Sequence, residues 1–137
     1  MKTIFVETSA LLRILLQEPG FEKAVEKLET ADRLFASRLL KLEAERAVIR
    51  AAHMQGERQP AVLISLRFNL KQLWSRFDCL EISREICDLA GQIAPESNLR
   101  SLDAIHAATF QWLTGLSQLN HADFRYVPLP LRVLPVR

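Results

Sequence analysis

Short apolar runs alternate with longer segments of helical periodicity along this chain. Three runs have the length of buried strands, and they lie at residues 3–6, 34–36 and 79–82. Two further short strands are expected near 117–120 and 131–134. The segments between them predict helices at 9–17, 21–30, 38–55, 61–77, 84–94 and 102–114. Such alternation is typical of an α/β domain with a mostly parallel sheet, and 137 residues suit one domain over residues 1–137.

Polar and breaking residues mark where these helices are expected to begin and end. A serine or threonine hydroxyl can accept a free backbone N–H at the first turn of a helix. We therefore expect N-caps at Thr8 or Ser9, Ser37, Ser83 and Ser101. Helix ends are expected at Pro19-Gly20, Gly56 and Gly115.

Large apolar side chains gather on one face of the helix expected at 61–77, which would also suit packing against a partner or a second copy. Trp74 belongs to this stripe and Trp112 to that of a later helix, so both are predicted to be core residues rather than base-stacking platforms. The spacing of Cys79 and Cys87 fits neither a metal ribbon nor a redox motif. Both are predicted to be buried small hydrophobes.

Composition places few constraints on function. The formal net charge of +2 does not by itself indicate a nucleic-acid binder, and 49% hydrophobic residues suffice for a substantial core. No apolar run reaches the roughly 18 residues needed to cross a bilayer, and the N-terminus lacks the features of a secretory signal. We therefore expect a soluble, cytoplasmic protein with no membrane partner.

Two acids near the start of the chain are candidates for chemistry. Glu7 directly follows the first strand, and ligands of open parallel sheets bind at the carboxyl ends of strands. Glu43 lies on the flank of the apolar stripe of the helix at 38–55, so it is predicted to be half-buried. Alternatively, Glu43 forms a salt bridge with Arg46 or Arg50 on the same helix.

Further acids follow at the same expected edge of the sheet. Asp103 lies in the first turn of its helix, where the helix dipole favours an acid, and Asn120 and Asp123 follow the fourth expected strand. Two unit charges 4 Å apart repel by about 4 kcal/mol at an effective dielectric of 20. Such a cluster persists best around a divalent cation, and all-oxygen ligands suit Mg²⁺ or Mn²⁺. A metal held this way can activate water and neutralise a phosphodiester in transition.

Four segments resemble the motifs of PIN-domain proteins. Those proteins usually open with a short strand and Asp-Thr-Ser-Ala-Leu, and the matching segment here is VETSALLRILLQEPG. Their second motif, a Ser or Thr that starts a helix with an acid six residues later, is similar to SRLLKLEAERAV. Their Leu-Asp-Ala-Ile-His-x-Ala motif matches RSLDAIHAATF, and their closing Asn-x-x-Asp-Phe segment is similar to LNHADFRYVPLPLRVLPV. The resemblance therefore covers the whole chain.

The resemblance implies a three-layer α/β/α domain that cleaves RNA with Mg²⁺ or Mn²⁺. Small bacterial members are mostly VapC-type toxins, so it also implies a cognate antitoxin protein as partner and a homodimer. The metal-site positions that the motifs imply are Glu7, Glu43, Asp103, and Asn120 or Asp123. Of these, Glu7, Glu43, Asp103 and Asp123 are implied to be catalytic.

Residues close to these acids are expected to support them. Thr8 and Ser9 would orient the carboxylate of Glu7. His106, the usual histidine of the family, lies one turn along from Asp103 and is interpreted as structural, with hydrogen bonds inside the site region.

Three arginines, Arg13, Arg38 and Arg46, lie near the expected active edge. Two interpretations stay open for them. They would contact RNA phosphates, which positions RNA without reading its sequence, or they would pair with Glu7, Glu43 or Glu45.

Position 7 departs from the family pattern, because Glu stands where Asp is usual. Glu carries the same charge on a longer arm, and a 1 Å displacement of a reacting group can cost on the order of 100-fold in rate. Asn120 is neutral, so Asp123 must supply any charge at the fourth position. A second hypothesis is therefore a catalytically weakened or inactive PIN domain that binds protein or RNA without cutting.

Overall fold

The computed structural model describes residues 2–54, 60–93 and 100–119, and within these ranges the chain forms three strands and six helices. Strands and helices alternate for most of this length, as the apolar runs predict. In chain order the elements are β1 (Thr3–Phe5), α1 (Thr8–Leu15), α2 (Phe21–Glu29), β2 (Arg33–Ser37), α3 (Arg38–Met54), α4 (Pro60–Trp74), β3 (Phe77–Leu80), α5 (Arg84–Gly91) and α6 (Ser101–Leu119).

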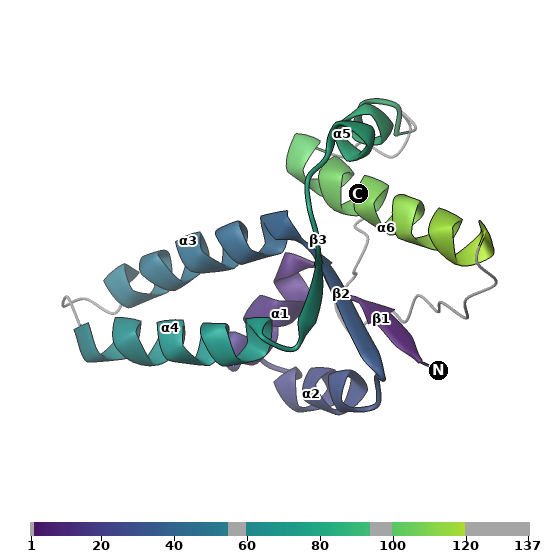
Figure 1. The fold of residues 1–137 in the computed structure, drawn as a ribbon. Coiled ribbons are helices and arrows are strands. Elements are labelled where there is room, and N and C mark those ends of the chain that lie inside the picture. Colours follow the sequence, from purple (N-terminus) through teal and green to yellow (C-terminus); the bar gives the residue numbers. More distant parts are fainter. Residues whose placement is uncertain (1, 55–59, 94–99, 120–137) are drawn as a thin grey trace.

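The three strands form one parallel sheet in the order β1-β2-β3. Ile4 of β1 pairs with Leu34 of β2, and Ala36 of β2 pairs with Cys79 of β3, so β2 lies between the other two. In Figure 1, α1, α3 and α4 lie on one side of the sheet, and α5 and α6 lie on the other. The predicted α/β domain with a parallel sheet between helical layers is confirmed.

Apolar side chains of the strands fill the space between the sheet and both helical layers. The ring of Phe5 in β1 lies 5.6 Å from that of Phe110 in α6, measured between centroids, with the planes tilted by 56°. Leu11 of α1 and Leu40 of α3 belong to the same core cluster and are fully buried. Burial of one such side chain stabilises the fold by about 1.5–3 kcal/mol. β1 and most of β2 are buried on both faces, which explains their continuous apolar runs, whereas β3 is partly exposed.

The carboxyl ends of β1 and β2 lead directly into helices at one edge of the sheet. The backbone N–H of Val6 donates to the carbonyl of Phe35 at 2.9 Å, which extends the pairing one residue beyond β1 and brings the chain to Glu7. Ser37, the last residue of β2, accepts the N–H of Leu39 at 3.1 Å and so begins α3. The parallel pairing therefore places the first turns of α1 and α3 side by side.

Two of the four predicted N-caps are confirmed. Ser37 caps α3, and the hydroxyl of Ser83 accepts the N–H of Ile86 at 3.2 Å at the start of α5. The prediction of Thr8 or Ser9 is wrong, because Glu7 occupies the N-cap position of α1. The prediction of Ser101 is also wrong, since that residue is already the first of α6.

α6 is longer than its glycine suggests. The sequence predicts an end at Gly115 and a strand near 117–120, but the helix continues to Leu119, so both predictions are wrong for the described residues. One glycine costs a helix only about 1 kcal/mol relative to alanine, which a helix of this length tolerates. The strand expected at 131–134 lies outside the described residues.

Several side chains differ from their predicted burial. Trp74 packs against the core as expected, with its ring 5.8 Å from that of Phe77 between centroids. Trp112 is 37% exposed, and Cys87 is exposed, so the predictions of core positions for these two are wrong. Cys79 is only partly buried. An apolar stripe on a helix is buried only where a neighbouring element covers that face. This explains why Trp112 is partly exposed.

A membrane-crossing helix would have to be long and consistently apolar, and none in the described ranges meets both conditions.

A matched pair of leucines on α3 tests the packing. Leu40→Ala should lower the free energy of unfolding by roughly 2–5 kcal/mol, because Leu40 is fully buried in the core and its truncation leaves a cavity. Leu42→Ala, two residues along on the exposed face, should change it by about 0.5 kcal/mol or less. Urea unfolding followed by circular dichroism measures both. Equal losses in the two variants would contradict the described orientation of α3.

Candidate functional site

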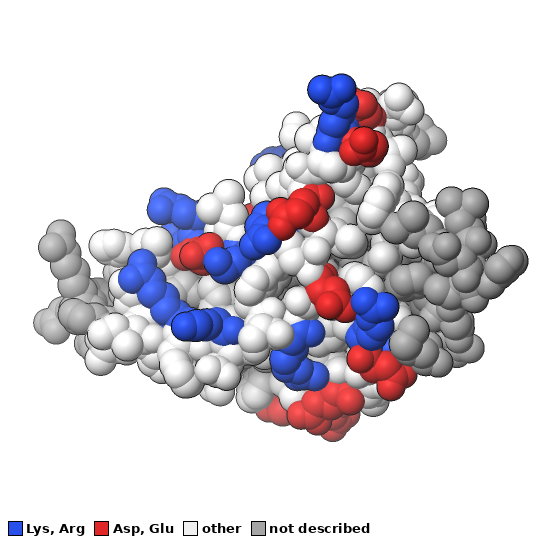
Figure 2. Space-filling model, viewed as in Figure 1, with Lys and Arg blue, Asp and Glu red and all other residues white. Residues whose placement is uncertain are grey.

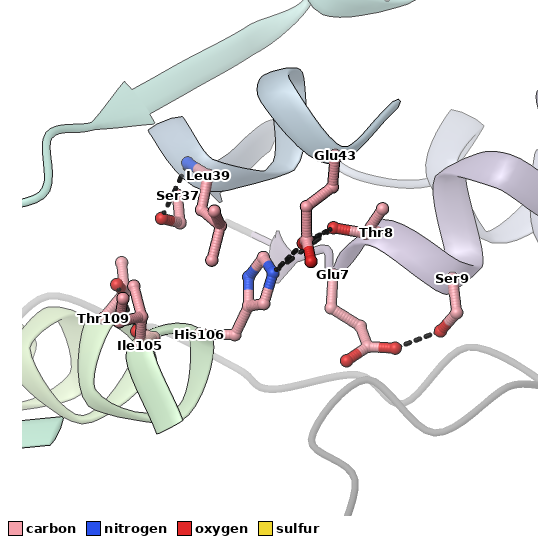
Figure 3. A network of polar contacts seen from close by, with 9 residues as sticks. All are labelled: Glu7, Thr8, Ser9, Ser37, Leu39, Glu43, Ile105, His106 and Thr109. Carbon is pink, nitrogen blue, oxygen red and sulfur yellow. Dashed lines mark hydrogen bonds and ion pairs between the residues drawn. The ribbon is translucent and has the colours of Figure 1, made fainter. Parts of the chain in front are cut away.

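A pocket of about 250 Å³ lies at the edge of the sheet where α1 and α3 begin. It is lined by polar side chains from three elements that are far apart in the sequence. The start of α1 contributes Thr8 and Ser9 beside Glu7, α3 contributes Glu43 and Arg50, and α6 contributes Asp103 and His106. Figure 3 shows Thr8 and His106 turned toward Glu43, and Glu7 turned toward Ser9.

Glu7 is the most deeply buried acid of this pocket, with 6% of its surface exposed. The hydroxyl of Ser9 donates a hydrogen bond to its carboxylate, as expected from the sequence. Burial raises the pKa of Glu7, and the negative charges of Asp103 and Glu43 raise it further against the opposing effects of Ser9 and His106. The ionised form of Glu7 is therefore costly until a positive charge enters the pocket.

Glu43 is held by two neighbours at one carboxylate oxygen. Its Oε1 lies 2.6 Å from the hydroxyl of Thr8 and 2.7 Å from Nε2 of His106. Burial alone would raise the pKa of Glu43, but the hydrogen bonds from His106 and Thr8 outweigh it and lower the pKa. Glu43 therefore keeps its negative charge at neutral pH.

These contacts change two expectations from the sequence. Glu43 is half-buried as predicted, with its side chain 28% exposed, but among the described residues its side chain contacts His106 and not Arg46 or Arg50. Thr8 donates to Glu43 and not to Glu7, because the first turn of α1 directs its hydroxyl toward α3. Of the two hydroxyls expected to orient Glu7, only that of Ser9 does so.

His106 links α6 to the other two elements. Its side chain is 3% exposed, and besides Glu43 it lies 3.3 Å from the Thr8 hydroxyl through the same Nε2 atom. Its Nδ1 atom is buried and has no hydrogen-bond partner among the described residues. The predicted hydrogen bonding of His106 inside the site region agrees with these contacts.

Asp103 lies one helical turn before His106 on α6 and lines the same pocket. Glu7, Glu43 and Asp103 thus reach one pocket from three elements. In the described ranges, no three His, Cys, Asp or Glu side chains converge as a preformed metal site would require. The predicted fourth position, Asn120 or Asp123, lies outside the described residues.

For Arg13, Arg38 and Arg46 the sequence allows either contact with RNA or pairing with Glu7, Glu43 or Glu45. None of the three lines this pocket. Arg38 forms an exposed ion pair with Glu81, and Arg13 packs against Gly20 at the far end of α1. Arg46 is exposed on α3. On the face seen in Figure 2, basic and acidic side chains are interspersed.

Among the described residues, Arg50 is the arginine that lines the pocket. From the sequence it is expected only as a salt-bridge partner of Glu43. Its position seven residues after Glu43 is a signal that could have found it. Residues two helical turns apart lie on the same face of a helix, so an arginine there shares the pocket with the acid. Leu12 of α1 lines the pocket as well and was also missed.

Comparisons with known proteins agree with this architecture. Residues 4–128 match the family model described as PIN domain. The chain is 31% identical over 113 residues to Ribonuclease VapC46 of Mycobacterium tuberculosis, an alignment that covers 82% of this chain and 78% of that protein.

Solved structures resemble the fold at low sequence identity. The structure of FitAB bound to an IR36 DNA fragment matches with a TM-score of 0.61 and 16% identity, covering 90% of this chain and 94% of the other. VapBC2 from Rickettsia felis, bound to a promoter DNA fragment, gives 0.57 and 13%, covering 90% and 85%. A toxin–antitoxin complex from Klebsiella pneumoniae gives 0.54 and 20%, covering 89% and 82%. By its motif segments, its fold and the match over residues 4–128, this chain belongs to the PIN domain family.

Proposed function

We propose that this protein is a metal-dependent endoribonuclease and the toxin component of a toxin–antitoxin pair. The observation that carries the proposal is that Glu7, Glu43 and Asp103 line one pocket although they come from three separate parts of the chain. The 31% identity to a protein named as a ribonuclease supports RNA as the substrate.

The donor set of the pocket fits Mg²⁺ or Mn²⁺. Carboxylate oxygens are the ligands these ions prefer, and burial and neighbouring charge make the ionised form of Glu7 costly without a cation. Glu7, Glu43 and Asp103 would hold the metal, together with Asn120 or Asp123. When bound, the metal would activate water and neutralise charge that develops on the phosphodiester.

The other residues of the pocket would prepare these acids and the substrate. Ser9 holds the carboxylate of Glu7, and Thr8 and His106 hold that of Glu43. Arg50 would contact an RNA phosphate beside the acids, because a guanidinium matches phosphate oxygens in charge and geometry. Glu7, Glu43, Asp103 and Asp123 are the proposed catalytic residues.

We also propose a cognate antitoxin protein as partner, a homodimer and a cytoplasmic location. The solved relatives include a toxin–antitoxin complex, which supports the antitoxin. Exposed apolar side chains on α4, Ile64 and Phe68, offer surface that a partner or a second copy would cover.

The central prediction concerns Asp103. Wild-type protein with Mn²⁺ should cleave RNA, and chelation of the metal should stop cleavage. Asp103→Asn should lower the cleavage rate at least about 100-fold, because losing a metal ligand should cost more activity than the 10–100-fold that outer-shell changes typically cost. Asp88→Asn, at an exposed acid on α5, should cleave as wild type does. Cleavage of a defined RNA by purified protein measures this, with expression toxicity in cells as a second readout.

Failure of that experiment would favour the second hypothesis. If wild-type protein binds RNA or a partner protein but cleaves no RNA with Mn²⁺ or Mg²⁺, the nuclease proposal is contradicted. The domain would then be a binding module.

Arg50→Ala should weaken RNA binding without affecting folding. We expect a loss of roughly 10-fold in affinity and a decrease of about one in the slope of log affinity against log salt concentration, as for one lost phosphate contact. RNA affinity is best measured in the Asp103→Asn background, where RNA stays intact. Arg46→Ala, an exposed arginine of the same helix outside the pocket, is the matched control, and equal effects would contradict the role of Arg50.

Glu7→Gln should stabilise the metal-free protein at pH 7. The pKa of Glu7 is raised above 4.5 in the folded state, so the unfolded chain loses this proton at a lower pH than the folded chain does. Above about pH 4.5, ionisation of Glu7 therefore favours the unfolded state. Removing the charge should raise the Tm by about 2–8 °C, the size of effect that roughly 1 kcal/mol gives in a domain. At pH 4, where Glu7 is protonated, most of the gain should disappear.

Thermal unfolding with a chelator at both pH values measures this gain. Glu45→Gln, at an exposed acid on α3, is the matched control and should leave the Tm unchanged. An equal gain at pH 4 and pH 7 would show that packing, and not the charge of Glu7, causes the effect.

A further inference from the structure

Two side chains meet a single oxygen of Glu43, although each comes from a different helix. The hydroxyl of Thr8, the first residue of α1, lies 2.6 Å from Oε1, and Nε2 of His106 on α6 lies 2.7 Å from the same atom. The other oxygen, Oε2, has no hydrogen-bond partner in the part of the chain that the structure describes. The two oxygens of one carboxylate therefore have different surroundings (Figure 3).

The buried Nδ1 atom of His106 settles the direction of these hydrogen bonds. Nδ1 has no partner among the described residues, so a proton there would be a buried donor without an acceptor, which is unfavourable. The proton therefore belongs on Nε2, and the ring donates to Oε1 of Glu43. In this tautomer Nε2 has no lone pair to offer Thr8, so the Thr8 hydroxyl also donates to Oε1.

A glutamate on a helix surface is otherwise free to adopt several rotamers. The side chain of Glu43 is 28% exposed, so it could turn toward solvent if nothing held it. His106 is almost fully buried and cannot follow such a movement, and Thr8 is fixed by the first turn of α1. Two donors at Oε1 thus hold the carboxylate over the pocket.

We propose that His106 and Thr8 are positioning residues that occupy Oε1 of Glu43 and leave Oε2 as the oxygen available to a divalent cation in the pocket. The proposal rests on the proposed function. It assigns His106, the histidine of the LDAIHAAT segment, a role beyond packing. Neither residue is proposed as a metal ligand, since the Thr8 hydroxyl and Nε2 of His106 are both turned to Oε1 of Glu43.

Substitutions that keep or move the donor test this arrangement. In His106→Gln the side-chain amide nitrogen can reach the position of Nε2, whereas in His106→Asn it reaches only that of Nδ1. Thr8→Ser keeps the hydroxyl and Thr8→Val removes it at nearly constant volume. Thr109→Val is the matched control, because the Thr109 hydroxyl donates to the Ile105 carbonyl within α6 and contacts no acid of the pocket.

The first readout is the dissociation constant for Mn²⁺, measured by calorimetry on the full chain without RNA. His106→Asn and Thr8→Val should weaken binding by roughly 10-fold or more, as loss of an outer-shell partner typically does, while His106→Gln and Thr8→Ser should stay within about threefold of wild type. The Tm of each variant shows whether it folds. Equal dissociation constants for the Gln and Asn variants, both folded, would overturn the proposal.

The second readout does not need the metal. Long-range ¹H–¹⁵N NMR identifies which ring nitrogen of His106 carries the proton, and the proposal expects it on Nε2 in the metal-free wild type. A proton on Nδ1 alone would overturn it. If wild-type protein neither binds Mn²⁺ nor cleaves RNA, the proposed function fails, and the position of this proton still decides whether His106 holds Glu43.

Discussion

Parallel pairing of β1 with β2 puts the carboxyl ends of both strands at the same edge of the sheet. Because Glu7 follows β1 and Ser37 starts α3, residues 30 positions apart in sequence begin two neighbouring helices. Antiparallel pairing would have sent these ends to opposite edges. The pocket therefore depends on a backbone register that buried apolar side chains such as Ile4 and Leu34 determine.

The same geometry makes the pocket costly for the fold. Three acids share it. Glu7 is the most buried of them, and burial raises its pKa. A domain that only had to fold would place an apolar or neutral side chain there. The retained charge is understandable if a cation enters the pocket, since the cation would reverse the repulsion that destabilises the metal-free protein.

How far the sequence predicts this structure depends on the range of the interactions involved. Apolar runs identified β1 and β2, and they placed β3 two residues too far along the chain. Ser37 and Ser83 identified helix starts, because a cap involves only neighbours in the chain. The half-burial of Glu43 followed from helical periodicity. The site acids were recognised through family motifs, which carry information that periodicity lacks.

Some of the wrong predictions concern contacts between distant segments, and others concern the ends of helices. Nothing local shows that the Thr8 hydroxyl turns to Glu43, or that His106 reaches the same oxygen from α6. Gly115 looked like a helix end because its weak local preference was considered without the rest of α6. Trp112 lies on an apolar stripe, but no described element covers it fully.

The two glutamates of the pocket differ more than their shared chemistry suggests. Thr8 and His106 lower the pKa of Glu43, so this carboxylate is ionised before any ligand arrives. Burial raises the pKa of Glu7, so a positive charge in the pocket would favour its ionised form. When environments push the pKa values of neighbouring groups apart, the groups take different roles. In the proposed site both carboxylates would hold the cation, with Glu43 oriented by Thr8 and His106 and Glu7 oriented by Ser9.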